Sequence, residues 1–474
     1  MKRLIQIIFY THFLLTASIV NSQNKLTLQQ CVETGIANNL LVQQSNYQMQ
    51  REEITWKQSK LNRLPDLNAN ANQGTNRGRS IDPFTNSYID EKVGFANYGL
   101  SSGILLFNGL SLHNNIKQNA LAFEAARMEL QQEKDNLTMN IILAYLQVLR
   151  SEEILNQSRN QVTLTSKQVE RMEVLNNEGA IVPSVLSDLR GQLSGDQISV
   201  IDAENTLASA KISLCQLMNV LCEKDMQVEK LEASSFASKY DISPDDIFTI
   251  ASKQFALIKA AELRKQSAAR AVKAIKGQLF PTLSLNGNLG TNYSSVAMQN
   301  FFINTTEVVS DDYVLVNGNP SPVIRKQSNF NSEKIRYTNQ LDNNLSTSLF
   351  INLNIPIFNS MLVRNRVKLA KIDLKNNEKI EETAKTQLRQ NIDLAHTNMI
   401  TAFDRYKTLL EQVKAYEESF RAAEIRFTEG VGTTIDYLTA KNNLDRASIN
   451  LITAKYDYVL RTKILDYYQG RPVF

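Results

Sequence analysis

The segment FTEGVGTTIDYLTA, residues 427–440, interrupts a stretch of more than a hundred residues that otherwise favours helix throughout. The segment NNEGAIVPSVLSDL, residues 176–189, lies 251 positions earlier and makes the same kind of break between equally long helical stretches. Glycine supplies backbone angles that other residues avoid, and Pro183 restricts the exit from the first break. Each break therefore predicts the hairpin turn of a helical pair, and the two together indicate an internal repeat.

The repeat extends to other short segments. Pro65, which follows a leucine, is matched 216 positions later by Pro281, and LLFNG from Leu105 is matched 251 positions later by PIFNS from Pro356. The spacing grows by 35 between the two strand-like segments of each copy. The second copy therefore carries an additional long loop near residues 294–343.

Each copy is predicted to run helix, strand, strand, long helix, turn, helix, because helical periodicity gives way to two-residue alternation and then returns. A signal peptide at 1–22 precedes the first copy, 23–220, which has strands near 66–76 and 95–107, a long helix at 111–178, a tip at 179–183 and a helix at 184–220. An equatorial connector at 221–241 leads to the second copy, 242–470, with strands near 282–293 and 344–358, a long helix at 361–428, a tip at 429–433, a helix at 434–469 and a chain end at 471–474.

Apolar residues recur every seven positions along the four long helical segments. A sustained step of seven is typical of a coiled-coil seam. The outgoing seams are Ile141, Val148, Leu155, Val162 and Val169, and Ile392, Met399, Tyr406, Val413, Phe420 and Phe427; the returning seams are Leu193, Val200, Leu207 and Leu214, and Leu444, Leu451, Tyr458 and Leu465. Because an exposed stripe of this length is unfavourable in water, partner chains are expected.

The strand segments alternate apolar residues with amides and small residues. In 282–293, Leu283, Leu285 and Leu289 alternate with Ser284, Asn286 and Asn288, and 344–358 and the segment around Tyr98–Leu106 show the same pattern. Apolar side chains toward lipid and polar ones toward the interior are typical of a transmembrane β-barrel, although a half-buried sheet in a soluble protein alternates as well. Four strands cannot close a barrel, so several chains must share one.

Composition narrows the function. Residues 1–22 have the layout of a secretory signal peptide, with a membrane anchor as the alternative. The formal net charge of +4 includes two basic residues of that segment and gives no case for nucleic acid. Cys215 and Cys222 are expected to be buried on one helix face. No phosphate loop, metal cluster or nucleophile arrangement is present in the sequence, so no enzyme, cofactor or metal is predicted.

Several segments of the sequence carry a family resemblance: TLQQCVETGIANNL, the Leu-Pro before each first strand, Phe-Asn-Gly and Phe-Asn-Ser after each second strand, and the segment from EGVGTTIDYLTAKNN to ILDYYQG. Together they resemble the TolC family of outer-membrane efflux and secretion ducts. The resemblance implies a mixed α and β membrane protein: a homotrimer with a shared twelve-stranded β-barrel in the outer membrane, and long coiled-coil hairpins forming a periplasmic α-barrel about 100 Å long. It also implies an equatorial collar formed by residues near 221–248 and the chain end, tips that dock a periplasmic membrane-fusion adaptor, and an inner-membrane pump served through the adaptor. The alternative is an exported periplasmic coiled-coil scaffold or adaptor without a pore.

The site residues follow from the resemblance and the breaks. An aspartate at Asp436, with Thr439 one turn on, is expected to form a pore constriction; Thr433 and Asp436 also read as a helix cap, and both roles stay open. The gate-equivalent positions are Val185, Phe427 and Gly432, which differ from the family's polar lock. The tip and adaptor-docking residues are Glu178, Gly179, Ala180, Ile181, Glu429, Gly430, Val431 and Gly432.

Overall fold

The computed structural model describes residues 25–81, 86–90, 92–223, 225–230 and 240–471, so the predicted signal peptide lies outside the described residues. The chain forms two compact units, and each draws on both copies of the repeat. Unit 1 comprises Met1–Ile54, Ala120–Ala268 and Asp373–Phe474, and unit 2 comprises Thr55–Asn119 and Ala269–Ile372. The predicted division into two successive copies therefore describes the sequence, whereas packing joins matching parts of the two copies.

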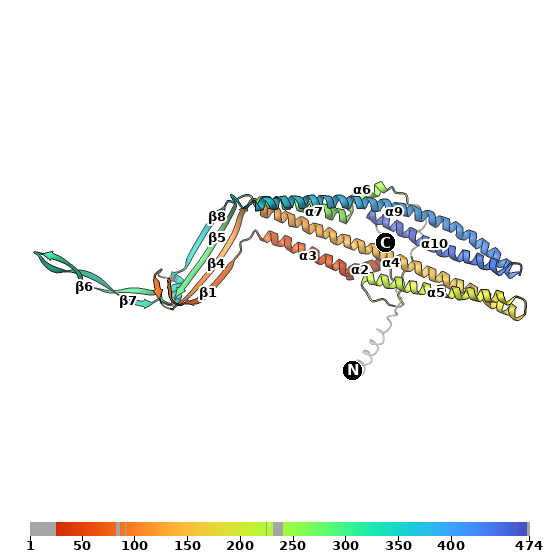
Figure 1. Cartoon of the computed structure of the whole chain (residues 1–474), viewed down its shortest axis with the longest axis horizontal. Helices are drawn as coiled ribbons and strands as arrows, with labels where there is room; N and C mark the ends of the chain where they lie inside the picture. The colour runs from red at the N-terminus through yellow and green to blue at the C-terminus, as the bar shows by residue number, and fades with distance from the viewer. Residues whose placement is uncertain (1–24, 82–85, 91, 224, 231–239, 472–474) are drawn as a thin grey trace, which may run out of the picture. The chain divides into compact units, whose positions relative to one another are not determined.

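Unit 2 is built on a four-stranded antiparallel sheet with the order β1-β4-β5-β8 (Figure 1). Its strands are β1 (Asn68–Asn76), β4 (Val93–Asn108), β5 (Thr282–Ser294) and β8 (Ser346–Asn354). The central pair β4–β5 joins the two copies, with Leu100 opposite Leu289. β1 and β8 are the edge strands, and their outer hydrogen-bonding groups have no strand partner in this sheet.

The register keeps the predicted alternation. Leu283 lies opposite Leu353 and Leu285 opposite Ile351, while Ser284 lies opposite Asn352. Leu349, Ile351 and Leu353 are between 58% and 75% exposed, so the apolar face is uncovered in the single chain. A bulge at Leu106 brings Phe107 opposite Leu283, so the expectation that Leu106 continues the apolar face is wrong.

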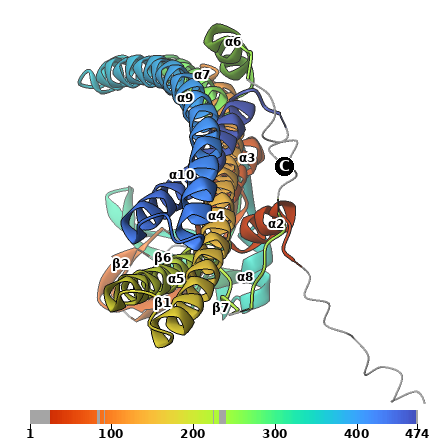
Figure 2. The same cartoon turned by 90° about the vertical axis from the view of Figure 1, so that its right-hand side faces the viewer.

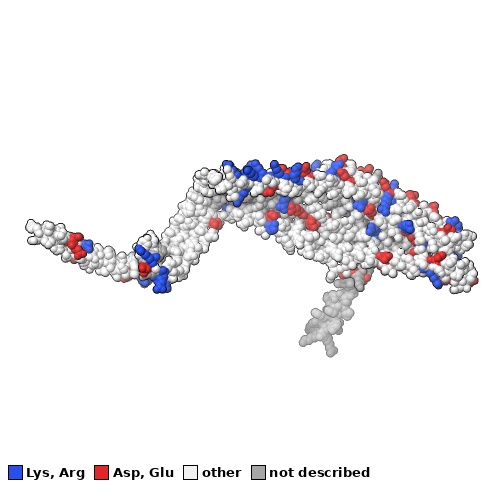
Figure 3. Space-filling model, in the orientation of Figure 1, with Lys and Arg blue, Asp and Glu red and all other residues white. Residues whose placement is uncertain are grey.

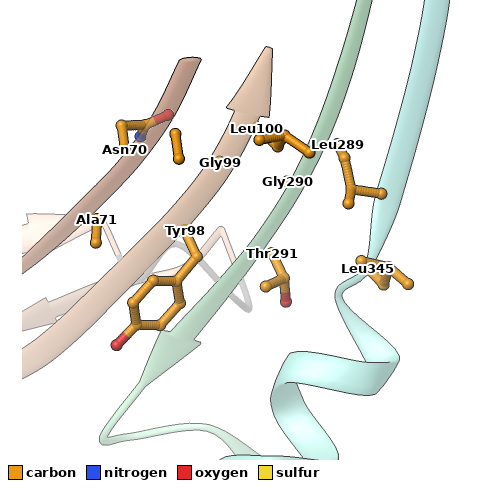
Figure 4. Close-up of a pocket in the computed structure, with 10 residues that line it drawn as sticks. Asn70, Ala71, Tyr98, Gly99, Leu100, Leu289, Gly290, Thr291 and Leu345 are labelled. Atoms are coloured by element: carbon orange, nitrogen blue, oxygen red, sulfur yellow. The ribbon is translucent and has the colours of Figure 1, made fainter. Parts of the chain in front are cut away.

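The apolar face is hollowed where β1 contributes only small side chains. A depression of about 380 Å³ lies between Ala69 and Ala71 on β1, Tyr98 on β4 and Leu289 on β5 (Figure 4). Alanine fills less volume than the leucines of the neighbouring strands, which explains both the depression and the weak alternation of β1 in the sequence.

The corners that lead from strand into long helix are the same in both copies. Gly109 and Leu110 have φ of 63° and 62°, and Ser360 and Met361, 251 positions later, have φ of 53° and 61°. Left-handed backbone is costly for residues other than glycine, so Leu110, Ser360 and Met361 are strained. Both copies of the repeat therefore carry backbone strain at the same corner.

The predicted long loop at 294–343 is largely regular, so that expectation is wrong. It contains β6 (Met298–Val316) and β7 (Asn319–Lys334), which pair as a separate two-stranded sheet, and the short helix α8 (Tyr337–Asn343). Bulges at Phe302/Asn304 and Val309/Tyr313 shift the register, and the sequence alternation is lost there. A second small pair, β2 (Arg79–Ile81) with β3 (Tyr88–Asp90), connects β1 to β4.

Unit 1 contains most of the length of the long helices. α4 (Ser111–Asn177) and α9 (Leu362–Thr428) have 67 residues each and lie beside α5 (Pro183–Met218) and α10 (Thr434–Tyr468), respectively (Figure 2). The heptad positions Ile141, Leu214, Ile392, Met399 and Leu465 are completely buried, as the seams predict. No helix in the described part of the chain is both long and apolar enough to span a membrane.

The two short helical segments are each divided in two. α2 (Leu28–Asn38) and α3 (Leu40–Leu61) are separated by an extended residue at Asn39, and α6 (Pro244–Gln254) and α7 (Ala256–Gly277) by one at Phe255. The side-chain amide of Asn39 donates to the Leu217 carbonyl, which fixes the first break against the end of α5. Thr27 caps α2 with a complete capping box.

The cysteines differ from expectation at one position. Cys31 and Cys215 are buried, but Cys222 is exposed and lies beyond the end of α5 at Met218. Asn219 ends that helix in a left-handed conformation, so Cys222 cannot share its buried face. Burial raises the pKa of the Cys31 thiol to about 11, which keeps that side chain neutral.

Candidate functional site

The two helical tips have the same backbone turn. Gly179 and Gly430 have φ of 72° and 74°, in agreement with the prediction. The amide of Ala180 donates to the Leu175 carbonyl at 2.8 Å, and the amide of Val431 donates to the Arg426 carbonyl at 3.0 Å. This is a Schellman C-cap, in which the glycine takes the left-handed position that closes the last helical turn.

Gly432 has a different function from the two tip glycines. Its φ is not positive, so the expectation that it supplies an unusual backbone angle is wrong. A Cβ at this position would approach the backbone carbon of Arg426 to 3.1 Å. The residue is therefore small because the chain passes close to the end of α9.

Asp436 contacts the N-cap of α10, in agreement with one of the two roles predicted for it. Thr433 is the N-cap of α10, and its Oγ1 accepts from the Asp436 amide at 3.1 Å. The Thr433 hydroxyl donates to the Asp436 carboxylate at 2.7 Å. Asp436 and Thr439 are both exposed in the single chain, so neither is needed for its core, and their role as a constriction stays a prediction.

An aromatic cluster supports the second tip. The ring of Tyr437 stacks on Phe427 with centroids 4.9 Å apart and lies 5.6 Å from Phe420. Phe427 is buried, so this gate-equivalent position belongs to the tip core together with Met172 and Leu186. The Tyr437 hydroxyl is buried without a hydrogen-bond partner among the described residues, and burial raises the pKa of this phenol.

A groove of about 620 Å³ lies between the two tips. It collects seven of the predicted tip and gate residues: Ala180, Ile181, Val185, Phe427, Glu429, Gly430 and Gly432. The guanidinium of Arg171 donates to the Thr428 carbonyl at 2.9 Å and thereby links the two hairpins. Glu178, Gly179, Val431, Asp436 and Thr439 do not line this groove.

A buried polar layer lies farther along the same helices. The ammonium of Lys441, 1% exposed, is 3.0 Å from the Asp196 carboxylate and 2.6 Å from that of Asp445. Thr165 of α4 also donates to Asp196, so three helices meet at this layer. Desolvation raises the pKa of Asp445, and the nearby Lys441 opposes that rise.

Sequence reasoning missed Lys441, Asp196 and Arg171. A signal was available for the first two, because Asp196 lies three residues after Leu193 and Lys441 three residues before Leu444. Positions three or four residues from a seam residue also face the partner helix, so a charge there must be buried and paired. Arg171 has no such signal, since its acceptor is a backbone carbonyl 257 positions away.

If the tips dock the adaptor of an export duct, as the resemblance to the TolC family implies, replacing Gly430 with valine is expected to abolish export while leaving the protein in the membrane. A β-branched residue at φ 74° is strained, although no atom lies within 4 Å of an added Cβ. Efflux by cells and the amount of membrane-inserted protein would be measured together. Gly191→Val, at an exposed glycine of α5 with equally open space, is the control, and normal efflux by Gly430→Val would contradict the prediction.

Comparisons with known proteins agree with this architecture. The family model described as outer membrane efflux protein matches residues 32–220 and 251–466. TolC of Vibrio cholerae is 21% identical over 86% of this chain and 82% of its own length, and TolC of Escherichia coli K12 is 20% identical over 70% of this chain but only 60% of its own length. The solved structure of VceC from Vibrio cholerae superposes with a TM-score of 0.74 at 14% identity, covering 94% of this chain and 97% of that one.

The family match spans both copies of the repeat and most of the chain. The structural likeness to VceC, at low identity, independently supports the same fold of long helical hairpins joined to a β-sheet. The chain therefore belongs to the outer membrane efflux protein family and is an outer-membrane channel of an efflux system.

Proposed function

We propose that three copies of the chain assemble into one duct, with the twelve strands of three sheets closed into a single barrel. The observation that carries this proposal is the open four-stranded sheet, whose edge strands β1 and β8 lack outer partners and whose apolar face is uncovered. Unpaired strand edges are not tolerated in lipid, and a closed ring of three sheets removes all of them.

The opposite face of the sheet gives the duct its polar lining. Asn97, Asn288 and Ser346 belong to this face, and the four strands contain no charged residue. An interior of amides and hydroxyls favours water-filled passage without strong charge selection.

The tip groove is proposed to dock a periplasmic adaptor, through which an inner-membrane pump delivers substrate. Apolar Ile181 and Val185 line the groove beside the charged side chains of Arg171, Asp188 and Glu429. Apolar anchors surrounded by charges are typical of a protein docking surface. The substrate is determined mainly by the pump in such an arrangement.

The assembly is tested by measuring the mass of the detergent-extracted protein and its conductance in a planar bilayer. A mass of three chains together with stable conducting steps is expected. A soluble monomer recovered from the periplasm would refute the duct and favour the pore-free scaffold, which the family match already disfavours.

Asp436→Asn is expected to weaken cation preference without closing the duct. Three carboxylates around a narrow axis would concentrate negative potential and attract cations. Asparagine keeps a side-chain oxygen that can accept from the hydroxyl of the N-cap Thr433, so folding should be little affected. Reversal potentials under a salt gradient would decide the matter, and a cation preference equal to that of the parent would leave Asp436 as a helix cap only.

A further inference from the structure

The helix ends next to the four-stranded sheet carry charges of almost one sign. The flanking segments 55–67, 109–119, 269–281 and 355–372 contain eleven Lys and Arg residues and a single acid, Asp66, although the whole chain is nearly balanced with 52 basic and 48 acidic residues. We name these eleven residues the basic collar. They are Lys57, Lys60, Arg63, Lys117, Arg270, Lys273, Lys276, Arg364, Arg366, Lys368 and Lys371.

The strand register places all these segments at one end of the sheet. Asn108 and Asn354 both lie opposite Thr282, so the end of β4, the start of β5 and the end of β8 coincide. Arg63 lies 3.4 Å from His113, which brings the segment before β1 to the same end. Figure 3 shows Lys and Arg gathered over α7 and the beginning of α9, beside strands without charge.

The other end of the sheet is different. Segments 77–92 and 333–342, which flank the strands there, together contain five basic and five acidic residues. The excess of positive charge is therefore confined to the end of the sheet where the long helices begin.

Among the described residues, the collar cations on α7 and α9 are mostly exposed and form no internal ion pair. In the described part of the chain, the ion pairs of α7 and α9 involve Arg264, Lys265, Lys379 and residues farther from the sheet, and none of the collar cations on these two helices. Collar residues on these helices are exposed, except for Arg270, which is half-buried.

The collar positions on α9 are unfavourable for that helix, whereas Lys60 and Lys276 lie in the last turns of α3 and α7, where the helix dipole favours cations. Arg364, Arg366 and Lys368 occupy the first two turns of α9, where the first turn has no acid. The positive end of the helix dipole disfavours cations there. The cations of α9 therefore do not stabilise their own helix, as is expected of residues that have a function outside it.

An apolar band separates the collar from the sheet. Ile357 and Phe358 are 95% and 76% exposed, and Phe280, Leu64 and Leu110 are also exposed. The ammonium of Lys60 lies 3.4 Å from the ring centroid of Trp56. Apolar side chains followed by long cationic ones that reach toward water are typical of a membrane interface.

We propose that the basic collar binds the phosphate groups of anionic phospholipids in the leaflet that faces the long helices. This inference rests on the membrane placement of the sheet given under Proposed function. The band from Phe280 to Phe358 contacts the acyl region, and the collar cations contact phosphates one to three helical turns beyond it. Three copies would encircle the barrel with a continuous ring of anion-binding side chains.

The test is to reconstitute the full chain in bilayer discs of phosphatidylcholine with a minority of phosphatidylglycerol and to measure the lipids retained after partial detergent stripping. The parent should retain phosphatidylglycerol above its bulk fraction, and less so as salt rises. The variant Arg364→Gln/Arg366→Gln/Lys368→Gln/Lys371→Gln should lose at least about threefold of that enrichment, because each cation near an anionic surface contributes a factor of about five.

The matched control is Arg405→Gln/Lys407→Gln/Lys414→Gln/Arg421→Gln, which removes the same charge from exposed positions of the same helix farther from the sheet. Equal enrichment in both variants, or none in the parent, would overturn the proposal. Displacement of the retained lipid by inorganic phosphate, but not by chloride at the same ionic strength, would assign the collar to free phosphate. Selective binding of the parent to isolated cell-wall polymer without lipid enrichment would assign it to that polymer. Either result would refute the lipid site.

Two further measurements keep the outcome decisive. If the collar variant does not insert, the salt series on the parent still tests the electrostatic attraction. The mass and conductance measurements test the trimeric duct separately, so a parent that conducts as a trimer without retaining anionic lipid refutes only the collar.

Discussion

Replacing Lys441 with methionine is expected to destabilise the helical tips by about 3–5 kcal/mol, because it leaves the buried Asp196 and the partly buried Asp445 without their counter-ion. Methionine preserves much of the side-chain volume, so the loss reports on charge rather than on a cavity. Hydrogen exchange of α5 and α10 in the detergent-solubilised full chain measures the effect, and faster exchange of both helices is expected.

Two variants show whether the buried charge is responsible. Adding Asp196→Asn and Asp445→Asn to Lys441→Met should recover a large part of the protection, since no unpaired charge then remains. Lys455→Met breaks a more exposed pair with Glu153 and should cost no more than about 1 kcal/mol. Unchanged exchange in Lys441→Met would mean that the layer does not hold the hairpins together.

Replacing Gly277 with alanine is expected to remove most of the folded protein from the outer membrane. An added Cβ would lie 2.7 Å from the Gly109 carbonyl oxygen and 2.8 Å from the Ser111 amide nitrogen. Both are backbone atoms, so no rotamer change relieves the contact, and the corner between β4 and α4 must shift. A fall of more than about tenfold in membrane-inserted protein corresponds to about 1.4 kcal/mol.

The same substitution at Gly195 is the matched control. Gly195 lies within α5 with no atom near an added Cβ, and alanine favours helix over glycine, so Gly195→Ala should be neutral or stabilising by about 0.5–1 kcal/mol. Membrane fractionation compares the two variants. Normal insertion of Gly277→Ala would show that the junction can move apart without loss of the fold.

Sequence patterns predicted the elements whose signal is repeated along the chain. The seven-residue period located the buried seams, and the Glu-Gly tips anticipated the positive φ of Gly179 and Gly430. Local patterns with interruptions were less informative. The hairpin of β6 and β7 was not predicted, because two bulges break its alternation, and Leu106 was placed on the wrong side of a bulge.

The candidate site was predicted at its turns but not at its contacts. Seven of the predicted tip and gate residues line one groove, and their role in docking stays a prediction. Arg171, which links the hairpins through a backbone carbonyl, has no recognisable motif. The capping contact between Thr433 and Asp436 joins residues only three positions apart, so it could be predicted from the sequence.

The sequence by itself determined the repeated order of helices and strands, the positions of the turns and the apolar and polar faces, because periodicity and backbone preference act between neighbours along the chain. The tertiary structure decided which distant groups meet: Gly109 with Gly277, Lys441 with Asp196, and the strands of both copies in one sheet. These contacts join residues well over a hundred positions apart, and they depend on shape and burial that only the packed chain defines.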